Sequence, residues 1–148
     1  PKGSRYSQVT EHVDIMPTLL EYAGIRPPYG VQGLSMASVL RGDKGAGREY
    51  AMTEFNCYDW GLSVKTLTGK DYKLTYYAGE PFGELYDRGA DPKEKVNLWD
   101  KEEYRPVKER MLRRLMDRLV ETEDPLHRRI VKYIHILVDM VKILVTLL

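Results

Sequence analysis

The segment TEFNCYDW, residues 53–60, carries the side chains of this chain whose types best suit the binding of a small ligand. They are the carboxylate of Glu54, the amide of Asn56 and the aromatic rings of Tyr58 and Trp60. Pockets for a sugar or an aryl alcohol combine such rings with a few directed polar groups. These four residues are therefore the candidate substrate-binding residues. The alternative is that Phe55 and Trp60 are ordinary core residues and that the polar residues decorate a loop.

Three further residues invite a catalytic or metal-binding assignment: Cys57, His12 and Asp14. A single cysteine excludes an internal disulfide and a cysteine-based zinc site. Asp14 is expected to cap a helix, and a lone histidine beside a cap, such as His12, is usually structural or solvated. Asp14 and His12 are therefore not expected to be catalytic residues or metal ligands.

The charges of the chain are balanced. Its 148 residues include 23 Lys and Arg against 22 Asp and Glu, a net charge of +1. This balance gives no long-range field to attract nucleic acid or an acidic membrane. The locally basic run over residues 105–118 is interpreted as the solvated face of a helix. No nucleic-acid partner is expected.

Two short helices are predicted ahead of the candidate residues. Pro17 has no amide hydrogen and fits the first turn of a helix capped by Asp14 and ended by Gly24. After a loop rich in proline and glycine, Ser35 is expected to cap a second helix over residues 36–41, stopped by a glycine.

From Glu49 onward the apolar pattern has a period of two. The predicted strands cover residues 49–55, 62–67, 72–77 and 84–87. A turn at residues 68–71 makes the second and third strands antiparallel neighbours, so we predict an antiparallel sheet of about four strands. A helix over residues 103–121 would cover one face of this sheet with an apolar stripe. The stripe consists of Val107, Met111, Leu115 and Leu119, widened by Leu112 and Met116. The fold class is α+β.

The last segment, residues 130–148, is apolar except for one polar stripe at helical spacing. The stripe consists of Lys132, His135, Asp139, Lys142 and Thr146. Two lysines and an aspartate argue against a transmembrane span, which needs about 20 mostly uncharged residues. So wide an apolar face must be buried against the core, a missing domain or another subunit. We expect a homo-oligomer formed through this C-terminal helix.

Five strings occur in order along the chain. They are VDIMPTLL (residues 13–20), GIRPPYGVQGLSMASVLRG (24–42), AMTEF (51–55), VKTLTGKDYKLTYY (64–77) and ELYDRGADPKEKVNLW (84–99). Together they resemble the C-terminal third of type I sulfatases, the arylsulfatase-like sulfate-ester hydrolases of the alkaline phosphatase superfamily. The resemblance covers about residues 2–124.

The resemblance implies a parent enzyme that cleaves sulfate esters with a formylglycine nucleophile and a divalent metal, Ca²⁺ or Mg²⁺. Formylglycine is made from the first residue of a C/S-x-P-x-R motif, and both groups lie upstream of VDIMPTLL in the family. Cys57 does not fit the motif, and the chain begins at Pro1 without an initiator Met. The resemblance therefore implies no catalytic residue and no metal ligand in this chain, and we expect an inactive, cofactor-free fragment whose partner is the missing N-terminal catalytic domain. In related enzymes the segment that matches residues 53–60 lies near the mouth of the active site.

The expected organisation has three parts. Residues 1–48 are a remnant of the larger α/β sulfatase domain, residues 49–124 are the C-terminal subdomain of sheet and helix, and residues 125–148 are an apolar amphipathic tail. Two alternatives stay open: a fragment of a related phosphonate or phosphodiester hydrolase, and a non-catalytic interaction module that assembles through its C-terminal helix. The residues upstream of Pro1 would separate the two kinds of hydrolase.

Overall fold

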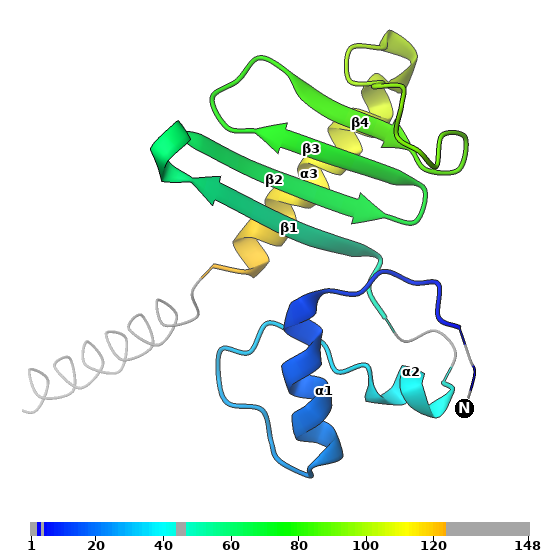
Figure 1. Cartoon of the computed structure of the whole chain (residues 1–148), viewed down its shortest axis with the longest axis vertical. Coiled ribbons are helices and arrows are strands. Elements are labelled where there is room, and N and C mark those ends of the chain that lie inside the picture. The colour runs from blue at the N-terminus through cyan, green and yellow to red at the C-terminus, as the bar shows by residue number, and fades with distance from the viewer. Residues whose placement is uncertain (1–2, 4, 44–46, 124–148) are drawn as a thin grey trace, which may run out of the picture.

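The computed structural model describes residues 3, 5–43 and 47–123, which form an N-terminal part (residues 5–43) and a sheet part (residues 47–123) (Figure 1). In the N-terminal part a 3-10 turn, His12–Asp14, leads into α1 (Ile15–Tyr22), and α2 (Ala37–Arg41) follows. The sheet part contains β1 (Tyr50–Cys57), β2 (Leu62–Gly69), β3 (Tyr72–Tyr77), β4 (Gly83–Asp87) and α3 (Arg105–Glu121), with 3-10 turns at Tyr58–Trp60 and Glu102–Tyr104. The predicted α+β class is confirmed.

The start of α1 differs from the prediction at Asp14. Pro17 lies in the first turn and Gly24, at φ +68°, follows the last turn, as expected. Asp14, however, already has helical backbone angles and its side chain makes no capping hydrogen bond to α1. Its carboxylate instead accepts the backbone N–H groups of Glu11 and Leu34, at 2.9 and 2.8 Å. The predicted cap was wrong because this carboxylate turns into the interior of the chain.

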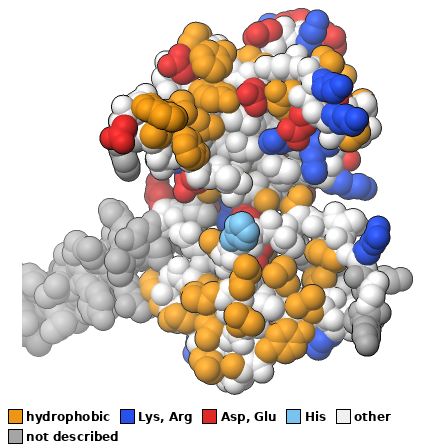
Figure 2. All heavy atoms as spheres, viewed as in Figure 1, with side chains coloured by type: hydrophobic (Ala, Val, Ile, Leu, Met, Phe, Trp, Pro, Cys, Tyr) orange, Lys and Arg blue, Asp and Glu red, His pale blue; other side chains and the backbone are white. Residues whose placement is uncertain are grey.

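Much of the apolar surface of the N-terminal part is uncovered. Ile15, Leu19 and Tyr22 share one face of α1, and they expose 49%, 63% and 56% of their surface. Figure 2 shows hydrophobic side chains gathered over this part, in the lower half of the view. The buried residues of α1 are Pro17 and Thr18. In the described structure α1 therefore has an open apolar face.

The sheet is an antiparallel meander in the order β1-β2-β3-β4. Each strand is joined to the next by a short turn. A turn connects β2 to β3 as predicted, but β2 continues through Thr68 to Gly69, two residues beyond its predicted end, so the turn is shorter than residues 68–71. Met52 pairs with Leu67, Leu67 with Leu74, and Leu74 with Leu85. Since directly paired residues point to the same side of a sheet, these four side chains form one apolar row.

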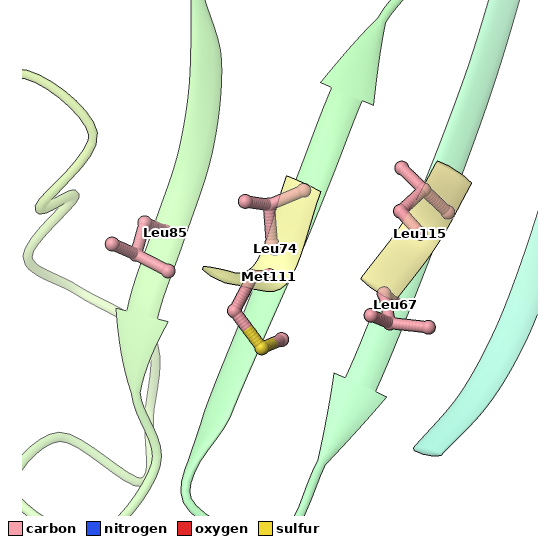
Figure 3. Packing of buried hydrophobic residues seen from close by; sticks show 5 residues of the cluster. All are labelled: Leu67, Leu74, Leu85, Met111 and Leu115. Carbon is pink, nitrogen blue, oxygen red and sulfur yellow. The ribbon is translucent and has the colours of Figure 1, made fainter. Parts of the chain in front are cut away.

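The core lies between this row and α3, which crosses the back of the sheet in Figure 1. Figure 3 shows Leu67, Leu74 and Leu85 from three adjacent strands beside Met111 and Leu115 of α3. Each of these side chains is at most 3% exposed. A fully buried leucine contributes about 1.5–3 kcal/mol. Val107, Leu112 and Leu119 pack around the cluster, as predicted.

Met116 was wrongly placed in the apolar stripe, because it is 67% exposed. It follows Leu115 directly, and one residue rotates a helix by about 100°. The described chain packs a single sheet against α3, so only a narrow stripe of the helix is covered.

The string ELYDRGADPKEKVNLW begins within β4, and the residues after β4 fold back along its outer edge. The Asn97 side chain accepts the Leu85 N–H at 3.0 Å and donates to the Gly83 carbonyl at 2.9 Å. Leu98 N–H adds a bond of 2.8 Å to the Leu85 carbonyl, and Asp91 accepts the N–H groups of Lys95 and Val96 at 2.6 and 2.8 Å. This segment protects a sheet edge whose backbone groups would otherwise be unpaired. The Glu94 N–H donates to the Asp91 carbonyl at 3.0 Å and closes a turn there.

The tail predicted over residues 125–148 lies outside the described residues. Its helical form, and the oligomer proposed to form through it, stay predictions. Across the described residues, no helix is both long and apolar enough to cross a membrane.

Candidate functional site

A cleft of about 820 Å³ lies between the N-terminal part and the sheet part. One wall comes from His12, Val13 and Ile15, and the other comes from residues 51–54 of β1 and from the end of α3. Ligand pockets have volumes of about 300–1,000 Å³ and combine apolar walls with a few polar groups. This cleft has that size and that mixture of side chains. Figure 2 shows the junction of the two parts as a narrow waist between the upper and lower halves of the view.

Glu11, which lines the cleft, joins the two parts. Its Oε1 accepts the backbone N–H of Met52 in β1 at 2.7 Å. Its Oε2 lies 3.2 Å from Nη2 of Arg48 and 3.1 Å from Nη2 of Arg118 in α3. The side chains of Glu11 and Arg48 are only 8% and 7% exposed. This carboxylate therefore contacts three residues of the sheet part: Arg48 just before β1, Met52 in β1 and Arg118 in α3.

Asp14 and Arg48 form a second contact between the parts. The Arg48 guanidinium donates to both carboxylate oxygens of Asp14, through Nε at 3.1 and 2.9 Å and through Nη2. Burial alone would raise the pKa of the Asp14 carboxyl, but the hydrogen bonds from Arg48, Glu11 and Leu34 outweigh it and the pKa is lowered. The hydrogen bond to Asp14 likewise raises the pKa of Arg48 despite its burial. Both groups stay charged in their buried pair.

The lowered pKa of Asp14 predicts acid sensitivity. In the unfolded chain an aspartate has a pKa of about 3.9, so ionised Asp14 stabilises the fold above about pH 4 and this stabilisation is lost as the pH falls through the lower, folded value. We expect Asp14→Asn to flatten the fall of the unfolding free energy between about pH 5 and 2, as measured by urea titrations. Glu21 also has a lowered pKa, from hydrogen bonds with Ser35 and Arg41. Because Glu21 is exposed, Glu21→Gln should change the slope much less; equal slopes for wild type and Asp14→Asn would contradict the prediction.

The four predicted substrate-binding residues lie at the far end of β1 and in the turn that follows. Glu54 lines the cleft and pairs with Lys65 at 2.9 Å. Asn56 accepts from the same Lys65 at 3.2 Å and from Ser63 at 2.8 Å. Lys65 therefore brings Glu54 and Asn56 together.

The two predicted aromatic residues, Tyr58 and Trp60, lie in the 3-10 turn beyond β1. Trp60 is 80% exposed and the neighbouring Phe55 is 53% exposed. The alternative that Phe55 and Trp60 are core residues is therefore wrong for the described structure. Neither Trp60 nor Asn56 lines the cleft, and the Tyr58 side chain lies outside the described part of the structure.

No residue of the described chain fits the catalytic metal or the formylglycine that the sulfatase resemblance implies. Across residues 3, 5–43 and 47–123, no three or more His, Cys, Asp or Glu side chains come together in a way that could hold a metal ion. Asp14 is engaged by Arg48, and His12 stands exposed on the wall of the cleft. Cys57 is a free, half-buried cysteine followed by Tyr58, not by the x-P-x-R of the motif. No chemical step is therefore assigned to these groups.

The residues that join the two parts were not predicted from the sequence. Glu11, Arg48 and Arg118 are far apart along the chain, and the Arg118–Glu11 bond spans 107 residues. One signal was present: Arg118 lies seven residues after Met111, two helical turns further along the same apolar stripe. A charged residue at a core-facing position indicates a buried partner.

A model of the family described as "N-sulphoglucosamine sulphohydrolase, C-terminal" matches residues 1–121. Among curated proteins, the N-acetylglucosamine-6-O-sulfatase of Bacteroides thetaiotaomicron is 33% identical to this chain over 128 residues. That match covers 82% of this chain and 22% of the relative.

Two solved structures also resemble this chain. A 2-O GAG sulfatase matches 78% of this chain with a TM-score of 0.69 and 30% identity. The phosphonate monoester hydrolase of Agrobacterium radiobacter matches 83% of it with a TM-score of 0.74 and 24% identity, which shows a common fold. The chain spans about a quarter of the length of each of these proteins.

Proposed function

The chain belongs to the sulfatase family, as a domain of the N-sulphoglucosamine sulphohydrolase C-terminal type, and from this membership we propose that it forms one wall of a sulfate-ester hydrolase site. In this proposal a catalytic domain precedes the chain in the whole protein and supplies the formylglycine nucleophile and the Ca²⁺ or Mg²⁺ ion. The chain itself supplies the subdomain that packs against that domain and contacts the alcohol portion of the substrate.

The main support for the proposal is the exposed apolar face of α1. Ile15, Leu19 and Tyr22 are about half exposed or more, and Met16, at 48%, is exposed beside them. Contiguous apolar surface of this kind is rare on a soluble monomer and marks a site of contact with another protein surface. A preceding catalytic domain is the partner that the family membership supplies. The N-terminal part would then belong structurally to that domain.

The substrate wall is proposed on β1 and on the turn that follows it. Glu54 and Asn56 offer a carboxylate and an amide, held in place by Lys65, and Trp60 offers an exposed ring. Such groups suit a carbohydrate, whose hydroxyls need hydrogen bonds and whose ring faces stack on aromatic side chains. The named relatives, an N-acetylglucosamine-6-O-sulfatase and a 2-O GAG sulfatase, support a sulfated carbohydrate as the substrate class.

Single substitutions in the whole protein test this wall. Glu54→Gln, Asn56→Ala and Tyr58→Phe should each lower kcat/KM for a sulfated carbohydrate by about two- to tenfold, because one hydrogen bond contributes about 0.5–1.5 kcal/mol. Glu103→Gln, an exposed change ahead of α3, is the matched control and should leave kcat/KM unchanged. If all three variants keep the wild-type kcat/KM and stability, residues 53–60 are an ordinary surface loop.

The fold alone also fits a second hydrolase. The phosphonate monoester hydrolase shares the architecture at a TM-score of 0.74, so a phosphonate or phosphodiester substrate is the competing candidate. Its nucleophile and anion-binding groups would likewise come from the preceding domain. Under either proposal the chain alone should not turn over an aryl sulfate in the presence of Ca²⁺ or Mg²⁺.

A further inference from the structure

Glu11 occupies the place of a neighbouring strand on the outer edge of β1. Val9 and Arg48 form an isolated antiparallel bridge, which is the first step of a strand pairing. The chain then leaves that edge at the His12–Asp14 turn, and the Glu11 carboxylate accepts the N–H of Met52, further along β1, at 2.7 Å. The Glu11 side chain thus accepts a β1 backbone N–H, as a backbone carbonyl of a further strand would do.

The same carboxylate also holds the end of α3. Arg118 donates to it from the covered side of α3, and Gln32 of the N-terminal part donates to the Thr122 carbonyl just beyond the helix at 2.6 Å. Met52 and Arg118 lie on different elements of the sheet part. Glu11 therefore ties the sheet and its covering helix to the N-terminal part at a single point.

The charges around Glu11 favour one arrangement of the two parts. Glu11 and Asp14 balance Arg48 and Arg118, and all four side chains are between 2% and 13% exposed. A buried charge left without its partner is strongly unfavourable, so the parts cannot move apart here without a cost in free energy. The network thus fixes the distance between the walls of the cleft.

We propose that Glu11 is a positioning residue, which sets the width of the cleft and places Glu54 and Asn56 for the substrate through its bond to Met52. Side chains at alternate positions of a strand point to the same side, so Met52, Glu54 and Asn56 form one row along β1. The consequence for the reaction rests on the proposed function, but the mechanical role of Glu11 does not.

The mechanical role is tested on this chain by a distance measurement. Spin labels on Arg26→Cys and Lys93→Cys, in a Cys57→Ser background, report the separation of the two parts, since both sites are exposed. The variant Glu11→Ala/Arg118→Met removes one charge of each sign and leaves the Arg48–Asp14 pair intact. We expect one narrow distance distribution in the parent and a broad one in this variant. An unchanged distribution in a variant that still unfolds cooperatively overturns the proposal.

A milder variant covers the case in which the double variant does not fold. Glu11→Gln keeps an acceptor for the Met52 N–H and loses only the charge, so we expect an intermediate broadening. Glu21→Gln, which removes the exposed pair with Arg41, is the matched control and should leave the distribution narrow. Equal distributions for Glu11→Gln, Glu21→Gln and the parent overturn the proposal as well.

The role in positioning is tested by kinetics on the whole protein. For a sulfated disaccharide that reaches β1, Glu11→Gln should raise KM by about tenfold or more without a matching loss of kcat, because small misplacements of a binding group are costly. A small aryl sulfate that does not reach β1 should keep both constants. An equal change for the two substrates overturns the positioning role. If the whole protein hydrolyses no sulfate ester, the proposed function fails, and the distance measurement decides the mechanical role by itself.

Discussion

Replacing Arg48 by alanine should destabilise the chain by about 3–5 kcal/mol, because it leaves two buried carboxylates with too few partners. Arg48 donates to both oxygens of Asp14 and lies 3.2 Å from Glu11. The Asp14 side chain is 2% exposed, so its charge is balanced by the guanidinium and not by bulk water. The free energy of unfolding, measured by urea titration near pH 7, gives the loss directly.

Two other arginine variants serve as controls for Arg48→Ala. Arg41→Ala breaks an ion pair with Glu21 whose side chains are 53% and 43% exposed, and it should cost less than about 1 kcal/mol. Arg48→Lys keeps the charge but not the planar fork, and it should fall between the two alanine variants. Similar losses for Arg48→Ala and Arg41→Ala would contradict the importance of the buried network.

Replacing Leu115 by alanine should cost about 2–5 kcal/mol, through lost burial and the cavity left behind. Leu115 is 3% exposed and packs against Leu67 and Leu74 of the sheet. The next residue, Met116, is 67% exposed, and Met116→Ala should change the stability by no more than about 0.5 kcal/mol. A loss below about 0.5 kcal/mol for Leu115→Ala would show that α3 does not cover the sheet as described.

The sheet was predictable because its determinants are local. Strand β3 has the predicted bounds, since the turn residues before Tyr72 and after Tyr77 stop the period-two pattern on both sides. Strand β1 was predicted two residues too short at its end, since its pairing with β2 continues to Cys57 opposite Leu62. Such a pairing depends on both strands, so the sequence of either strand alone does not indicate where it ends.

The contacts at the cleft were not predictable from local patterns. Asp14 was predicted to be a helix cap from its position just ahead of α1. Its partners Leu34 and Arg48 are 20 and 34 residues away, so the local sequence does not reveal them. Glu54 was selected by its chemistry and does line the cleft. Glu11, which contacts β1, Arg48 and α3, stands in a stretch of sequence without any motif that would single it out. Long-range ion pairs depend on the tertiary fold and have no periodicity.

The most direct test measures which ester the whole protein cleaves. An aryl sulfate and a phosphonate monoester with the same leaving group are offered to the whole protein and to this chain alone, in the presence of Ca²⁺ or Mg²⁺. We predict that the whole protein hydrolyses the sulfate ester with the higher kcat/KM and that the chain alone hydrolyses neither. A higher kcat/KM for the phosphonate ester, or turnover by the chain alone that a single substitution within it abolishes, would contradict the proposal that this chain is the non-catalytic C-terminal wall of a sulfatase.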